Sequence, residues 1–568
     1  MFPIDAHSFR RAALTSLGLR SLRLALLCVV FVVSIVSFLN LRYTVNDNTG
    51  IIDFMTGGYP IPYVGIALSS LLHQAYVLAP GVHWFAFTLY ALQTLSLFLW
   101  LMLVWRVFRN RWLAAAGTLV VLGYYLGFIV SLDFTATSIM LCTVALSWAC
   151  VQAVERRPGS LCFLGPGVVF AIGMLVRPQG ASGTLAYALP LAVLTAVSCI
   201  RGRALMPEAR RLGLAACLFL LPAVLNQGVD TLWRDAVRTP QETQYDAFNA
   251  AGGRLMHLNP GRVYAISQDP ALLAAVHWTP RDVSHFQHWQ FLDERVYTPE
   301  SFQTLWAGAP LPTFTPGYVD QRILQRFPPH SYVFLLLAAA LPLFLYLLGW
   351  SRIEGVIGIG LPVYFVSLTV FMYLMYAYGE RVEWPFETGI GFAGLLMAGL
   401  LAYRQDRIKG RGFLLAACAS MGIALVGTGF AVQETLSDQQ QVAVTAAQVR
   451  HRVYGLNKYF AGSVILVQPN SLDLNVLSPL EHVELHFQPI NLGWNTFSPR
   501  FYRQISALGI EHGYQLVDAL IDRPDTYVLG PQEWCQNLLS YASDSDRRGI
   551  RLVNVGTELF RLSEDKKK

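Results

Sequence analysis

The stretch Leu24-Ala-Leu-Leu-Cys-Val-Val-Phe-Val-Val-Ser-Ile-Val-Ser-Phe-Leu-Asn40 contains no charged residue. A helix needs roughly 17 to 25 mostly apolar residues to cross a hydrocarbon core of about 30 Å, so this run is long enough. A signal peptide is the alternative, but no small-residue cleavage site follows the run and many similar runs come after it. We therefore expect an uncleaved first transmembrane helix.

Similar apolar runs recur along most of the chain. Of the 568 residues, 54% are hydrophobic and 14% are charged, whereas about a quarter of the residues in a typical soluble protein are charged. The runs lie at 24–40, 84–105, 112–131, 136–153, 161–176, 183–200, 212–227, 332–350, 355–377, 386–403 and 412–432. The sequence predicts a polytopic α-helical membrane protein with about eleven transmembrane helices in a domain over residues 1–432.

Basic residues concentrate in alternate short loops, and this bias sets the orientation of a membrane protein. The N-terminus and the loops after the second, fourth and sixth runs are rich in arginine, whereas the intervening short loops carry only Arg42, Arg177 and Arg381. We therefore expect a cytoplasmic N-terminus. The loops 41–83 and 228–331 would then face outward, into the periplasm if the protein lies in a bacterial inner membrane.

The polar tail over residues 433–568 predicts a small extracytoplasmic α/β domain. Ser463–Gln468 and Asp525–Gly530 have the composition of buried strands, and Arg551–Val555 with Glu558–Leu562 predict a closing hairpin.

Asp47 lies a few residues after the first apolar run, in Tyr43-Thr-Val-Asn-Asp-Asn-Thr-Gly-Ile-Ile-Asp53. A carboxylate at the outer edge of a bilayer is suited to general-base catalysis, in which it accepts the proton of an attacking sugar hydroxyl. Negative charge also favours the oxocarbenium-like transition state of sugar transfer. Asp53 is the alternative base. For both acids, the alternative to catalysis is capping a turn or a helix.

The residues after Asp53 predict the rest of a pocket. Tyr59–Pro62 has the composition of a turn, and Val64–Val77 predicts an amphipathic helix along the outer interface, with His73 on its polar side. An acidic loop followed by such a helix would form a half-buried pocket open to lipid and water. Tyr59 and His73 are the substrate-binding residues expected there.

Two further outer positions carry charge. Arg177, at the end of the fifth run, offers a permanently charged planar fork of donors to the phosphate of a lipid carrier. Snorkelling to the headgroups is the alternative. Glu380, Arg381 and Glu383 lie before the tenth run, and charges at such a rim tend to mark binding sites. Local pairing of arginine with glutamate is the alternative there.

The sequence gives little sign of a cofactor. It contains no GxxxxGK[ST] phosphate-binding loop, so ATP-driven transport by this chain is not expected. His285 and His288 would share one helical face near Asp282 and suit a metal ion, although packing or surface roles are more usual for such pairs. No cofactor follows with certainty, and a divalent cation remains an option. Membrane lipid is an expected partner, and nucleic acid is not.

The segment Asn46-Asp47-Asn48, the Gly57-Gly58-Tyr59 turn, the interfacial helix and Arg177-Pro-Gln-Gly resemble the GT-C superfamily of membrane glycosyltransferases. The multi-span body with its outward C-terminal domain looks like the branch that includes arabinofuranosyltransferases and mannosyltransferases. The resemblance implies inverting transfer from a polyprenyl-phosphate-linked sugar to a glycan, lipid or protein acceptor. It implies Asp47 as the base. The family often has an Asp-Asp pair at this point, and in this chain Asn48 stands in the place of the second acid. It also implies Arg177 and Arg381 as ligands of the carrier phosphate.

Two other functions fit parts of the sequence. An O-antigen polymerase or ligase would use arginine and histidine residues of the long outer loop, such as Arg254, His257, Arg262 and His285. A transporter or lipid flippase would be expected to bury ionisable residues within its spans or to show inverted repeats. Neither feature is clear in this chain.

Overall fold

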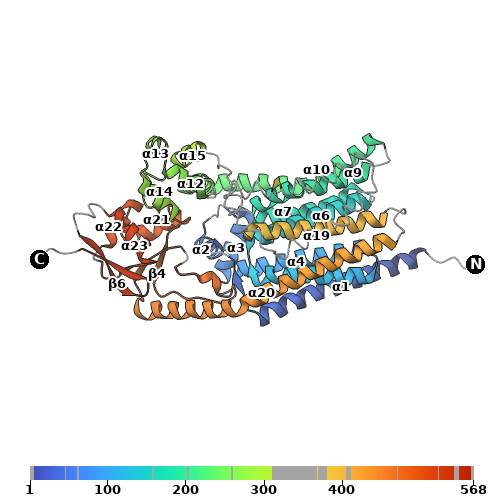
Figure 1. The fold of residues 1–568 in the computed structure, drawn as a ribbon, viewed down its shortest axis with the longest axis horizontal. Helices are drawn as coiled ribbons and strands as arrows, with labels where there is room; N and C mark the ends of the chain where they lie inside the picture. Colours follow the sequence, from blue (N-terminus) through green and yellow to red (C-terminus); the bar gives the residue numbers. More distant parts are fainter. Residues whose placement is uncertain are drawn as a thin grey trace, which may run out of the picture.

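The structure is a computed structural model that describes residues 6–44, 47–59, 63–155, 159–200, 204–256, 260–309, 367–368, 380–404, 411–469, 471–521, 523–542 and 549–564. It consists of a bundle of long helices and a mixed α/β layer at one end of the bundle (Figure 1). The predicted spans at 332–350 and 355–377 lie outside the described residues, apart from Ser367 and Leu368.

Apolar helices of different lengths form the bundle. They are α1 (Ala6–Phe38), α4 (Trp84–Val107), α5 (Arg111–Val130), α6 (Phe134–Glu155), α7 (Leu164–Val176), α8 (Pro178–Tyr187), α9 (Leu189–Ile200), α10 (Leu205–Val237), α19 (Glu380–Arg404) and α20 (Arg411–Tyr459). Among the described residues, five helices are long and apolar enough to cross a membrane, or six if α8 and α9, bent by 51°, form one span. The chain thus has the character of a multi-pass membrane protein, but the predicted count of about eleven is not reached in this part of it.

Helix α6 lies at the centre of the bundle and packs against α4, α7 and α19. In its most apolar stretch, 94% of the residues are buried. Gly173 of α7 permits the close approach to α6, because a Cβ added there would lie only 2.6 Å from Cys142 Sγ of α6. Asp133 caps α6, since its Oδ1 accepts a hydrogen bond of 2.8 Å from the backbone N–H of Ala136.

The α/β layer contains a five-stranded sheet in the order β4-β3-β5-β7-β6. Its strands are β3 (Val464–Val467), β4 (Gln488–Asn491), β5 (Thr526–Leu529), β6 (Ile550–Gly556) and β7 (Leu559–Glu564). β3 is parallel to β4 and β5, whereas β7 is antiparallel to β5 and β6. The tail, predicted as a small α/β domain, contains this small mixed sheet, and the predicted closing hairpin corresponds to β6 and β7. β4 was not predicted.

Helices of the long insertion complete the same layer. They are α11 (Pro240–Met256), α12 (Pro260–Ser267), α13 (Pro270–Ala275), α14 (Pro280–Gln287) and α15 (Pro299–Gly308). The tail adds α21 (Pro499–Ser506), α22 (Leu516–Leu520) and α23 (Gln532–Leu538). Phe248 and Phe302 of the insertion share one hydrophobic core with Leu466 and Phe501 of the tail. The insertion and the tail therefore form a single folded unit.

Helix α20 connects this unit to the bundle. It runs without a break through the predicted domain boundary at 432/433 and ends below the sheet (Figure 1). Near the bundle, Asp438 forms an ion pair of 3.5 Å with Arg42, and the Gln439 amide oxygen accepts a hydrogen bond of 2.7 Å from the backbone N–H of Asn40. These contacts tie α20 to the segment that follows α1.

Candidate functional site

The first outer segment folds into two short helices, α2 (Asp47–Gly57) and α3 (Ile66–Leu78). Before them, β1 (Arg42–Tyr43) pairs in parallel with β2 (Ser131–Leu132), which fixes the chain as it leaves α1. Asp47 is the first residue of α2, where negative charge is favoured by the helix dipole. The helix predicted from Val64 to Val77 corresponds to α3.

Helix α2 is clamped between the insertion and the tail. Phe54 stacks on Trp494, with 5.3 Å between ring centroids, and on Tyr245, with 5.9 Å. The Tyr245 hydroxyl donates a hydrogen bond of 2.9 Å to the carbonyl oxygen of Trp494. Gly50 allows this approach, because a Cβ there would lie 2.5 Å from Trp494 Cζ2. The position of α2 therefore depends on residues far away in the sequence.

Asp53 is held by Arg500. The Arg500 Nη2 atom lies 3.2 Å from Asp53 Oδ2, and Nη1 donates a hydrogen bond of 2.7 Å to the Asp53 carbonyl oxygen. Burial raises the pKa of Asp53 above its ordinary value, and the Arg500 charge offsets part of that rise. These contacts give Asp53 a structural role in joining α2 to the tail.

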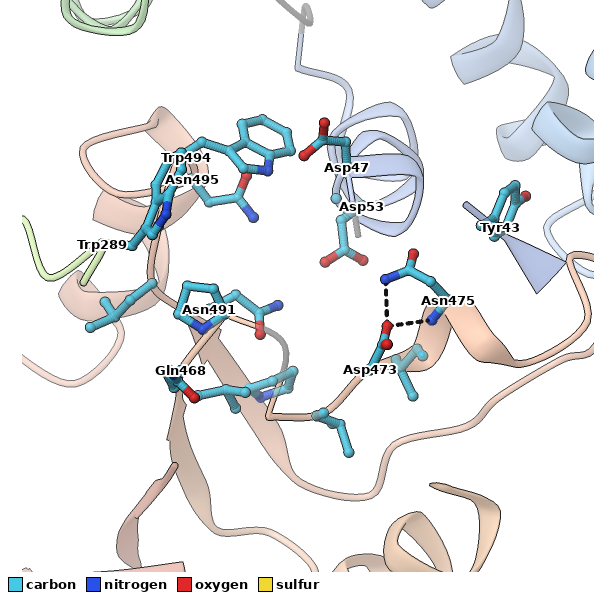
Figure 2. Close-up of a pocket in the computed structure, with 18 of the residues that line it drawn as sticks. Tyr43, Asp47, Asp53, Trp289, Gln468, Asp473, Asn475, Asn491, Trp494 and Asn495 are labelled. Atoms are coloured by element: carbon cyan, nitrogen blue, oxygen red, sulfur yellow. Dashed lines mark hydrogen bonds between the residues drawn. The ribbon is translucent and has the colours of Figure 1, made fainter. Parts of the chain in front are cut away.

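A cavity of about 960 Å³ lies between α2 and the loops of the tail. Asp47, Asp53 and Arg177 all line it, so the structure brings these three predicted site residues together. Figure 2 shows Asp47 and Asp53 extending from α2 into the cavity. The cavity is at the upper end of the range for small-molecule sites, roughly 300–1,000 Å³.

Arg177 reaches the cavity from the end of α7. Its guanidinium lies over the rings of Phe134 and Tyr63, with 4.7 Å and 5.9 Å to the ring centroids. The Arg177 carbonyl oxygen accepts a hydrogen bond of 3.0 Å from Ser138 Oγ. The backbone is thus fixed to α6, while the aromatic rings orient the cation at the bundle end of the cavity.

Tyr59 and His73 do not line this cavity, and their binding of substrate stays a prediction. Gly58, at φ +79°, ends α2, and His73 Nδ1 lies 2.7 Å from the carbonyl oxygen of Met55 in its last turn. The Tyr59 ring packs edge-on against Phe54. Both residues therefore support the end of α2. On the polar side of α3, His73 thus contacts the backbone of α2.

The structure describes the predicted site residues of α19 and of the insertion to different extents. Glu380, Arg381 and Glu383 form the start of α19, but their side chains lie outside the described part of the structure, so their roles remain predictions. His285 is buried, with Nδ1 2.8 Å from the Gln290 amide oxygen and Nε2 2.7 Å from Ser540 Oγ.

The residues considered for a metal or for a polymerase are mostly engaged in packing. Asp282 caps α14, and Arg262 is buried with a hydrogen bond of 3.0 Å to the carbonyl oxygen of Ala309. Arg254 is exposed, and His257 lies outside the described residues. Among the described residues, no group of three or more His, Cys, Asp or Glu side chains could hold a metal ion.

Sequence reasoning missed the outer wall of the cavity. This wall is built from residues of the tail and one residue of the insertion: Trp289, Gln468, Asp473, Asn475, Asn491, Trp494, Asn495 and Arg500. One signal was available, because Gln468 follows β3 and Asn491 ends the parallel strand β4. Side chains at the carboxyl ends of parallel strands commonly form binding sites.

No family model, curated protein or solved structure matches this chain.

Proposed function

We propose that the protein is a membrane glycosyltransferase of the GT-C type, which transfers a sugar from a polyprenyl-phosphate-linked donor to an acceptor hydroxyl. The observation that carries the proposal is the shared cavity of Asp47 and Arg177 at the junction between the helix bundle and the α/β layer. A lipid-linked donor has an apolar chain and a charged headgroup, so its reacting carbon would lie at such a junction.

The two side chains have complementary tasks in this reaction. The acceptor oxygen attacks the anomeric carbon from the face opposite the phosphate, and the bond from that carbon to the phosphate oxygen breaks. The electron pair of that bond leaves with the polyprenyl phosphate, whose charge Arg177 neutralises. Asp47 accepts the acceptor's hydroxyl proton. Asp53 positions α2 through Arg500 and is not the base.

The membrane arrangement is part of the same proposal. It has about eleven spans, a cytoplasmic N-terminus, and the cavity on the outer face of a bacterial inner membrane. The donor brings its own activation as a phosphate ester, which suits a site on the side away from ATP. The buried, hydrogen-bonded states of Arg262 and His285 give little support to the polymerase alternative.

A turnover assay tests this function. The full chain in lipid nanodiscs is supplied with polyprenyl phosphates carrying a hexose or a pentose and with mixed glycan, lipid and peptide acceptors. Release of polyprenyl phosphate is followed by mass spectrometry. We expect Asp47→Asn to slow release at least a hundredfold, since general-base catalysis contributes about 10²–10⁴-fold.

Asp269→Asn is the matched control. Asp269 caps α13 away from the cavity, and asparagine can make the same cap. Equal rates for Asp47→Asn and Asp269→Asn, or no turnover of any donor by the unaltered protein, would contradict the proposal.

A further inference from the structure

The outer wall of the cavity differs in chemistry from the bundle end. It presents the neutral amides of Gln468, Asn475, Asn491 and Asn495 and the indole rings of Trp289 and Trp494. Its two charged side chains are engaged, Arg500 with Asp53 and Asp473 with Asn475. The bundle end presents Arg42 and Arg177. One end is therefore suited to an anion, and the other to a neutral ligand with many hydroxyl groups.

In the part of the chain that the structure describes, two amide oxygens of this wall are buried without a hydrogen-bond partner. Asn475 is 3% exposed, and among the described residues its Oδ1 accepts no hydrogen bond. The same holds for Oδ1 of Asn495. Buried polar atoms are normally paired, so acceptors left open beside a cavity point to a ligand that supplies the donors.

The Asn475 amide is held in one orientation. Its Nδ2 donates a hydrogen bond of 2.8 Å to Asp473 Oδ1, which also accepts the backbone N–H of Asn475. Because Nδ2 is engaged in this way, Oδ1 is the amide atom left to accept a further hydrogen bond. Figure 2 shows the Asn475 amide between Asp53 and Asp473, among the residues that line the cavity. Asp473 thus fixes an acceptor close to the acids of α2.

The backbone conformation also fixes the positions of the two indole rings in the wall. Trp289 has a left-handed φ of +59°, which is uncommon for a residue other than glycine and costs energy unless its surroundings hold it. The turn at Gly493, with φ +112°, packs between Pro469 and Trp289, and a Cβ there would lie 3.1 Å from Pro469 Cγ. These constraints fix Trp289 and the neighbouring Trp494 before any ligand arrives.

We propose that this wall, made by Asn475, Asn495, Trp289 and Trp494, is an acceptor subsite for a neutral glycan. The inference rests on the proposed function and narrows the acceptor from glycan, lipid or peptide to carbohydrate. Sugar hydroxyls donate to the open amide oxygens, and the apolar face of a sugar ring packs on an indole. The glycan is then placed with a hydroxyl near Asp47, while the donor phosphate lies at the arginine end.

Binding of neutral oligosaccharides to the full chain in nanodiscs tests the subsite. The probes are neutral pentasaccharides of glucose, mannose and galactose, and binding is measured by saturation-transfer NMR and by titration. We expect at least one probe to bind. Asn475→Ala should weaken that binding by about tenfold, the effect of losing one neutral hydrogen bond at a buried group.

Asn457→Ala is the matched control. Asn457 hydrogen-bonds the Glu484 carbonyl oxygen on the same unit but does not line the cavity, so this variant should bind the glycan as the unaltered protein does. Equal weakening by both substitutions would overturn the subsite, because the loss would then reflect general damage to the layer.

A second measurement separates this inference from the proposed function. Sugar transfer is measured in parallel with glycan, peptide and lipid acceptors. Transfer to a peptide or lipid, with no binding of or transfer to any neutral glycan, overturns the glycan subsite and leaves the glycosyltransferase proposal intact. Glycan binding that survives Asp47→Asn, with transfer abolished, supports both.

Discussion

Gly50→Ala tests the clamp that positions α2 and its acids. Alanine in place of glycine inside a helix usually stabilises it by about 1 kcal/mol. Here the new Cβ would lie 2.5 Å from Trp494 Cζ2, and overpacking of this kind costs about 1–3 kcal/mol. We therefore expect the free energy of docking between Trp494 and α2 to become less favourable by up to about 2 kcal/mol. This corresponds to a factor of roughly thirty in the equilibrium constant for docking.

Hydrogen exchange provides the assay. Protection of the α2 backbone amides should fall in Gly50→Ala. The matched control is Gly455→Ala in α20, where a Cβ meets no atom within 4 Å, so only the helix gain of about 1 kcal/mol applies. If Gly50→Ala increased protection of α2 as Gly455→Ala does for α20, Trp494 would not be packed against α2 and the reasoning would be refuted.

Three further outcomes follow from the ion pair and the buried imidazole. Arg500→Ala should loosen α2 by about 1–2 kcal/mol, seen as faster hydrogen exchange of its backbone amides. The control is Arg523→Ala, since Arg523 donates a hydrogen bond of 3.0 Å to the carbonyl oxygen of Leu508 in the tail and does not line the cavity. Unchanged exchange in Arg500→Ala would contradict the anchoring role. The pKa of Asp53 is raised from 3.8, so the folded state holds the Asp53 proton more tightly than the unfolded state does. The docking of α2 on the tail should therefore weaken as the pH rises above about 4 through the pKa of the folded state. Asp53→Asn should remove this pH dependence, and a dependence that persisted in the variant would belong to another group. Burial lowers the pKa of His285 below 6.5, so the unfolded state binds a proton at a higher pH than the folded state does. The insertion should therefore separate from the tail more easily as the pH falls below 6.5. A melting temperature that does not change between about pH 7 and pH 5 would contradict this.

Local sequence patterns were sufficient for the elements that bury apolar surface. The runs at 84–105 and 112–131 became α4 and α5, and Ser463–Gln468 contains β3. β4 was not predicted because its four residues include Pro489 and because it lies at the edge of the sheet, where the alternation of apolar and polar residues is weak. Spacing alone can detect a span or a central strand, but not a short edge strand.

The candidate site was only half visible from the sequence. Asp47 and Arg177 stood out because charge is rare near apolar spans, and both line the cavity. Arg500 did not, because it contacts Asp53 across 447 residues of chain. His73 contacts the carbonyl oxygen of Met55, a pairing that its place on the polar side of α3 did not reveal. Such long-range pairings follow from tertiary packing, which no local pattern reports.

An experimental structure with undecaprenyl phosphate in nanodiscs tests the central claim most directly. We expect the phosphate in the cavity beside Arg177, the lipid chain along the outside of the bundle, and Asp47 facing the vacant sugar position. A phosphate bound elsewhere, with Arg177 and Asp47 untouched at saturating lipid, would contradict the account.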